Sequence, residues 1–164
     1  TAAAEIVVLS GHNMLWHIVQ QHPEQAIRLR AFSGFIRGAY ELDSISRLAL
    51  AHRPFETLEK SWDTGAFYTA GVDRQPLDWP EARKMIETVD PADMQYDMMG
   101  NAKGIRRYCV AIYGPDGAMT CLLTVAEAAT PLRDEAQHVA NIRSHLMTQK
   151  AKIESAFSDP VKTG

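Results

Sequence analysis

Two strand-like runs on either side of a tight turn constrain this chain more than any other stretch of its sequence. The segment from Gly104 to Val125 reads GIRRYCVAIYGPDGAMTCLLTV, with apolar and β-branched residues flanking Pro115-Asp116-Gly117. Proline supplies the φ of about −65° that the second residue of a turn needs, and glycine tolerates the positive φ that can follow. The segment therefore predicts an antiparallel β-hairpin.

The remaining periodicities add few helices between strands. Residues 5–20 predict a second hairpin, 26–31 a half-buried strand, 32–39 a loop and 94–99 a further strand. Helices are predicted from Leu42 to just before Pro54, over 55–62 and over 80–89, with a polar, turn-rich segment over 63–79. A doubly wound parallel sheet needs more crossover helices than this. The order predicts an α+β fold with a mainly antiparallel sheet and packed helices.

The longest predicted helix closes the chain. It begins at Thr130-Pro131, where threonine can cap and proline suits the first helical position, and it ends at Asp159-Pro160. Apolar residues recur every three or four positions along it, so one face should be buried against the sheet. That face comprises Leu132, Ala136, Val139, Arg143, Leu146, Lys150, Ile153 and Phe157.

Composition excludes several classes of protein. The 164 residues are 46% apolar with a formal net charge of −3, which fits one globular domain over 1–164 and argues against a broad nucleic-acid-binding surface. No apolar run reaches the length of a membrane span and no signal peptide opens the chain, so the expected compartment is the cytoplasm. The chain opens TAAAEIVVL, without methionine and directly into a strand, which suggests a piece of a longer protein.

Catalytic and metal-binding patterns are missing from the sequence. There is no CxxC, HExxH, G-x-S-x-G or phosphate-binding loop, and His12, His17 and His22 are spaced so that neighbours in a strand lie on opposite faces. His138 and His145 share one face of the last helix, where a solvated stripe is expected. We therefore expect no metal, no cofactor and no enzymatic activity.

The two cysteines lie across the predicted hairpin. With Pro115–Gly117 as its loop, Cys109 should face Leu123, Ala111 should face Cys121, and both thiols should lie on one face as diagonal neighbours. Diagonal pairs lack the geometry of a disulfide, so two free thiols are expected.

Arg106 and Arg107 open the first strand of the hairpin, so their side chains should point to opposite faces. We expect one to be solvated and the other to be buried against a carboxylate, since a buried arginine needs a partner. Asp97 is the internal candidate, and an acidic ligand is the other. Met94, Met98 and Met99 lie nearby, either as core or as pocket lining.

Three segments together are similar to one known family. The segment GIRRYCVAIYGPDGAMTCLLTVAEAATPL (104–132) resembles the end of the effector-binding domain of IclR-type bacterial transcription regulators. FSGFIRGAYELDSISRLALAHRP (32–54) looks like that family's glycine loop and following helix, and MIETVDPADMQYDMMGNAKG (85–104) like the stretch before the hairpin. The matches cover most of 5–157 in the family's order.

The resemblance implies a GAF/PAS-like fold with a pocket for a small organic acid, aromatic or not. It also implies a homodimer or homotetramer that binds DNA through an N-terminal winged helix-turn-helix, which these 164 residues do not include. Carried over by position, the effector-binding residues are Leu29, Gly38, Tyr40, Ser44, Ile45, Asp97, Ile105, Arg107, Thr124 and Ala126.

The chain also departs from the family pattern. Ala39-Tyr40-Glu41 stands where the family has Pro-Leu-His, Arg107 where a small residue is common, and Ala126 where a hydroxyl is expected. Arg107 implies a smaller pocket or a salt bridge to an acidic effector. Two alternatives remain open: a free-standing GAF/PAS-like sensor or interaction module, and a small enzyme that uses converging histidine or cysteine side chains.

Overall fold

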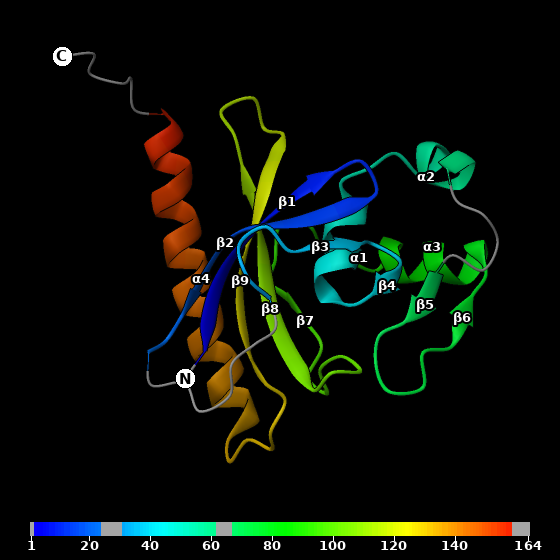
Figure 1. Ribbon diagram of the computed structural model, residues 1–164. Helices are drawn as coiled ribbons and strands as arrows, with labels where there is room; N and C mark the ends of the chain where they lie inside the picture. The colour runs from blue at the N-terminus through cyan, green and yellow to red at the C-terminus, as the bar shows by residue number, and fades with distance from the viewer. Residues whose placement is uncertain (1, 24–30, 62–66, 159–164) are drawn as a thin grey trace.

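A six-stranded antiparallel sheet forms the centre of the molecule, in the order β3-β2-β1-β9-β8-β7 (Figure 1). The computed structural model describes residues 2–23, 31–61 and 67–158. Its strands are β1 (Ala3–Ser10), β2 (Asn13–Gln21), β3 (Ile36–Gly38), β7 (Gln95–Tyr96), β8 (Ile105–Tyr113) and β9 (Met119–Ala128). Both predicted hairpins are present, as β1–β2 and β8–β9.

Helices cover both faces of this sheet. Helix α1 (Ser44–Ala51) contacts β8 from one side, and the long helix α4 (Glu135–Ser158) contacts β8 and β9 from the other (Figure 1). Beyond α1 lie α2 (Phe55–Ser61), α3 (Trp79–Glu87) and a small sheet of β4 (Glu41–Leu42), β5 (Phe67–Thr69) and β6 (Pro76–Leu77). The predicted α+β class with a mainly antiparallel sheet is confirmed.

Alternation along the hairpin strands builds two separate cores. Cys109 and Ala111 of β8 and Leu122 of β9 pack toward α1 in a cluster with Val7, Met14 and Trp16. Tyr108, Val110 and Ile112 point the other way and pack with Leu146 of α4. Strand β8 is thus buried on both faces, whereas β9 is only partly buried on its α4 side, so polar side chains on β8 need hydrogen-bond partners.

The predicted register of the β8–β9 hairpin was wrong by one residue. Cys109 lies opposite Thr124 and Ile112 opposite Cys121, because the register shifts between Ile112 and Tyr113. The thiols therefore lie on opposite faces, with Cys109 in the α1 cluster and Cys121 packed against the α4 cluster. Both are free, as expected.

Helix α4 begins later than predicted. The Asp134 carboxylate accepts a hydrogen bond from the backbone N–H of Gln137, so Asp134 performs the capping role that was expected of Thr130. Two other expectations also needed correction. Part of the predicted loop over 32–39 is strand β3, and the turn-rich segment over 63–79 includes β5 and β6. The strand expected over 26–31 falls almost wholly outside the described residues.

Candidate functional site

Arg107 forms a buried ion pair that crosses three strands of the sheet. It lies opposite Ala126 of β9, whose small side chain leaves room for the arginine to extend toward β1. There its Nε donates to Glu5 Oε2 at 2.9 Å, and its Nη2 lies 3.4 Å from Oε1. The Thr124 hydroxyl donates to the same Oε2 at 2.8 Å. The Glu5 side chain has no exposed area and that of Arg107 is 8% exposed.

The Nη1 group of Arg107 makes no hydrogen bond to any residue in the described part of the chain. The guanidinium carbon lies 5.6 Å from the ring centroid of Trp16, close enough for a cation–π contact. Glu5 therefore balances the charge of Arg107 but does not use the hydrogen-bonding capacity of its Nη1 group.

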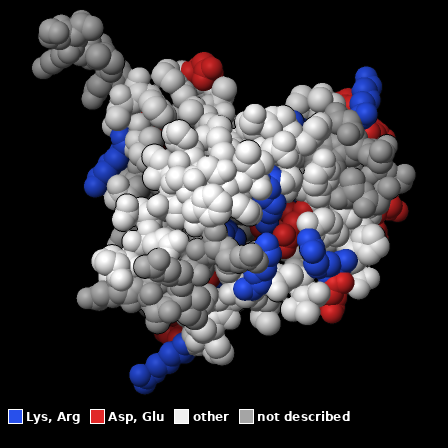
Figure 2. All heavy atoms as spheres, viewed as in Figure 1, with Lys and Arg blue, Asp and Glu red and all other residues white. Residues whose placement is uncertain are grey.

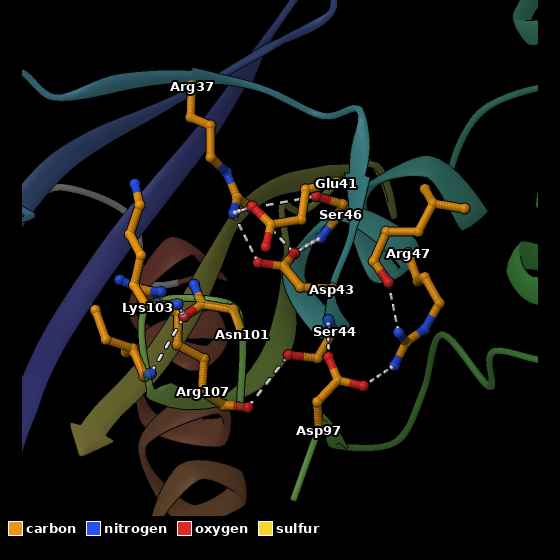
Figure 3. Close-up of polar contacts among 12 residues, drawn as sticks. Arg37, Glu41, Asp43, Ser44, Ser46, Arg47, Asp97, Asn101, Lys103 and Arg107 are labelled. Atoms are coloured by element: carbon orange, nitrogen blue, oxygen red, sulfur yellow. Dashed lines mark hydrogen bonds and ion pairs between the residues drawn. The ribbon is translucent and has the colours of Figure 1, made fainter. Parts of the chain in front are cut away.

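A second buried network surrounds Arg37 of β3. Its Nη1 lies 3.2 Å from Glu41 and 2.8 Å from Asp43, and its Nη2 also donates to Ser46 (Figure 3). Asp43 caps α1 by accepting from the Ser46 backbone N–H at 3.0 Å. Burial acts to lower the pKa of Arg37, but Asp43 and Glu41 outweigh it and raise that pKa. Burial acts to raise the pKa of Asp43, but Arg37 holds it below its usual value.

Asp97 joins the start of α1 to the β7–β8 connection. It accepts from the Ser44 backbone N–H at 2.6 Å and from Arg47 at 2.7 Å (Figure 3). The Ser44 hydroxyl in turn donates to the backbone carbonyl of Arg107 at 3.2 Å. These contacts hold α1 against the strand that carries Arg107.

A small cavity opens between these networks. It has a volume of about 30 Å³ and is lined by Trp16, Ala31, Phe35, Arg37, Glu41, Asn101, Lys103, Ile105 and Arg107. That volume holds roughly two water-sized groups. Figure 2 shows cationic and anionic side chains side by side near the centre of this face, over the region of β3 and β4.

Two buried donors with no hydrogen-bond acceptor in the described chain belong to side chains that line this cavity. They are the indole Nε1 of Trp16 and the Nε of Arg37. Buried donors are normally paired, so each orphan needs an explanation such as a bound molecule. Lys103 also lines the cavity and makes no ion pair with a described residue. The side chains around the cavity therefore include two unpaired buried donors and one exposed lysine without an ion-pair partner among the described residues.

The ten sequence-predicted site residues are only partly brought together. Ile105 and Arg107 line the cavity, and Thr124 and Ala126 lie behind Arg107. Ser44 and Asp97 belong to the adjacent contacts that hold α1 against β8. Ile45 is buried in the hydrophobic cluster between α1 and the sheet. Gly38 and Tyr40 lie next to Arg37 and Glu41 in the chain but do not line the cavity. Leu29 lies outside the described residues.

The expectations for the paired arginines needed two corrections. Neither is solvated: Arg106 faces α4 and its Nη1 contacts Glu127 at 3.0 Å, while its other nitrogens donate to the carbonyls of Met98 and Thr130. Asp97 is not the partner of either arginine, because it pairs with Arg47. The expected opposite orientation of the two side chains is confirmed.

Sequence reasoning missed most of the cavity lining. Trp16, Arg37, Glu41 and Lys103 were not singled out, and neither was Glu5, which lies 102 residues from Arg107 in the chain. The available signal was a single glutamate within the β-branched run AEIVVL, at a position that should face the core.

Among the described residues, the lining of this cavity contains no histidine or cysteine. Burial raises the pKa of the Cys109 thiol. It also raises the pKa of the Cys121 thiol, which is less deeply buried. No three His, Cys, Asp or Glu side chains of the described residues form a group that could hold a metal ion. None of the described helices combines the length and apolarity needed to cross a membrane.

Solved structures similar to this one are transcriptional regulators. An IclR transcriptional regulator from Alicyclobacillus acidocaldarius aligns with a TM-score of 0.73 at 14% identity, over 95% of this chain and 61% of that one. The C-terminal domain of the Escherichia coli regulator KdgR aligns at 0.71 and 14% identity, over 96% and 88%. No protein-family model and no curated protein sequence matches the chain.

A third similar structure contains a ligand. It is the inducer-binding domain of a double mutant of the Acinetobacter transcription factor PobR, in complex with 3-hydroxybenzoic acid. It aligns with a TM-score of 0.74 at 16% identity, over 93% of this chain and 87% of that domain. The chain spans about 60% of the length of the larger regulators that it matches. From β1 to α4, this chain has the fold of the C-terminal, effector-binding domain of IclR-type transcriptional regulators.

Proposed function

We propose that residues 1–164 form the single ligand-sensing domain of an IclR-like transcription regulator that binds a small organic acid. In this proposal the domain has no catalytic role and acts in the cytoplasm as a homodimer or homotetramer. An attached DNA-binding domain, outside these residues, changes its affinity for an operator when the ligand binds. A ligand can cause such a change only if it binds one arrangement of the domains more tightly than the other.

The observation that supports this function best is the cavity on the α1 face of a fold shared with regulator domains. Its lining includes Trp16 and Arg37, whose Nε1 and Nε are unpaired buried donors, and the exposed Lys103. A carboxylate has acceptor oxygens only, and two of them fit a space of about 30 Å³. In this proposal one acid group pairs with Lys103 and, after a local shift that exposes it, accepts from the indole N–H of Trp16.

Ligand binding can be tested on this chain by thermal shift and calorimetry. The panel comprises formate, acetate, benzoate and 3-hydroxybenzoate, each beside its neutral amide. We expect at least one acid to raise the melting temperature more than its amide. Replacing Lys103 by methionine should remove that difference, whereas the same change at Lys60 in α2, away from the cavity, should leave it intact. Equal responses to every acid and amide would contradict an acid-sensing role.

The free-standing GAF/PAS-like module is the second reading, and DNA binding separates the two. In the full-length protein, fluorescence anisotropy with DNA from its own upstream region should show binding that the ligand strengthens or weakens. Ligand binding by a protein that never binds DNA would favour the free-standing module.

A further inference from the structure

We infer that Glu5 is a built-in counter-carboxylate that determines which ligand charge the cavity accepts. This inference rests on the proposed function and concerns a residue that does not itself line the cavity. Glu5 lies on β1 opposite Thr124, across β9 from the strand of Arg107, and it is the one described carboxylate that forms an ion pair with Arg107.

The charges around the cavity add up in a way that supports this assignment. Arg37 is shared between Glu41 and Asp43, Arg107 is held by Glu5, and Lys103 remains single. The six groups together carry three positive and three negative charges. Glu5 keeps this sum at zero, and without it the same groups would carry one net positive charge that favours an acid over a neutral ligand.

The geometry shows how tightly Glu5 holds this position. Its Oε2 accepts from both Arg107 Nε and Thr124 Oγ1, and the Thr124 hydroxyl has no other described partner. Glu5 and Thr124 lie directly opposite each other in the β1–β9 register, so the strand pairing fixes this contact. Only Nη1 of Arg107 is left without a described acceptor, on a side chain that lines the cavity.

Replacing Glu5 by glutamine removes the charge but keeps an amide oxygen that can accept from Arg107 and Thr124. Arg107 then presents an unbalanced charge to the cavity. At the effective dielectric constant of about 20 that suits such sites, one charge several ångströms away changes affinity on the order of tenfold or more. Formate and acetate should gain about that much affinity in Glu5→Gln, while their amides should not.

Two controls separate charge from disturbance of the fold. Glu5→Asp keeps the carboxylate, so the preference between acid and amide should stay that of the wild type. Glu127→Gln makes the same chemical change at the Arg106 pair on the opposite face and should leave ligand preference unchanged. If Glu5→Gln does not fold, Thr124→Val loosens one of the two contacts to Glu5 and should give a smaller gain in acid affinity.

The binding experiment is isothermal calorimetry on the wild type and the four variants, with circular dichroism to confirm folding. A folded Glu5→Gln whose affinity for acids is unchanged, or rises equally for amides, overturns the inference. In that case wild-type binding that depends on Lys103 would still support the proposed function. The converse result, acid binding by Glu5→Gln but by no wild-type sample, would support the role of Glu5 and count against an acid as the natural ligand.

Discussion

Arg106 and Arg107 are adjacent in sequence, and each forms a buried ion pair on its own face of the sheet. On the α4 face, Arg106 bonds Glu127 and two backbone carbonyls, and Glu127 also accepts from Tyr108 and contacts His138. On the α1 face, Glu5 is the only hydrogen-bond acceptor of the Arg107 side chain among the described residues, and the arginine borders a cavity. The first pair links a loop, a strand and a helix through hydrogen bonds. The second pair leaves the Nη1 group of Arg107 without a described hydrogen-bond acceptor.

The largest effect should come from deleting the glutamate of each pair. Glu5→Ala leaves Arg107 without any described hydrogen-bond acceptor and should lower the free energy of unfolding by about 3–5 kcal/mol. Glu127→Ala should lower it by less, because Arg106 keeps the carbonyls of Met98 and Thr130. Urea denaturation monitored by circular dichroism measures both. A larger loss in Glu127→Ala would reverse the contrast drawn between the faces.

The Arg37–Asp43 pair makes the α1 face sensitive to acid. Because the folded pKa of Asp43 lies below its usual value, its contribution to stability is complete above about pH 4 and is lost as the pH falls through the folded pKa. Asp43→Asn keeps a capping side chain but should lower stability by roughly 1–3 kcal/mol at pH 7 and flatten its dependence on acid pH.

Melting temperatures between pH 3 and pH 7 test this prediction. Asp78→Asn is the matched control, since Asp78 caps α3 at an exposed site and forms no ion pair with a described arginine. A wild-type acid transition that Asp43→Asn leaves unaltered would show that the charge of Asp43 is not what the α1 face depends on.

Removing the orphan indole N–H should have a smaller effect. Trp16→Phe should reduce affinity for the ligand roughly threefold to tenfold, the value of one lost hydrogen bond. Its stability should fall by about 1–2 kcal/mol from lost packing volume. Trp79→Phe, in the aromatic contacts of α3 away from the cavity, should leave affinity unchanged. Calorimetry with the acid of the panel that binds most tightly measures the affinity of both variants. Equal affinity in Trp16→Phe and Trp79→Phe would contradict a role for the indole N–H.

The cysteines should show the smallest effect. Cys109 is fully buried on the α1 face and Cys121 partly buried on the α4 face, and burial raises the pKa of both thiols. A thiol reagent at pH 8 should therefore label Cys121 slowly and Cys109 only after unfolding. Mass spectrometry of the labelled peptides reads out each site. Rapid labelling of Cys109 in the folded protein would mean that the α1 face opens in solution.

Short-range signals in the sequence account for most of the fold. The hairpins and the first helix follow from alternation, helical spacing and turn residues within a few positions. The predicted register of β8 and β9 was wrong because the shift between Ile112 and Tyr113 has no signature in the residue pattern. The predicted start of α4 was wrong because Thr130-Pro131 and Asp134 can both begin a helix. Only tertiary contacts select one of them.

The candidate site was harder to predict because its pairs are long-range. Arg107 and Glu5 meet only once β9 is placed between β1 and β8, and no local pattern reports that pairing. Asp97 was chosen as the partner because it is near Arg107 in sequence, but Arg47 and the start of α1 satisfy it. The burial of Arg107 was correctly expected. Its partner, Glu5, could be identified only once the order of the strands in the sheet was known.

Ala126 has a consequence for related sequences that can be checked without a protein sample. Arg107 lies opposite Ala126 on β9, and Glu5 lies opposite Thr124 two residues away, so the arginine reaches Glu5 by passing the single methyl group of Ala126. A branched or longer side chain there would block the path of the arginine. Among relatives of this chain, an arginine at 107 and a glutamate at 5 should therefore occur together with alanine or glycine at 126. Where 126 is larger, positions 5 and 107 should change as a set.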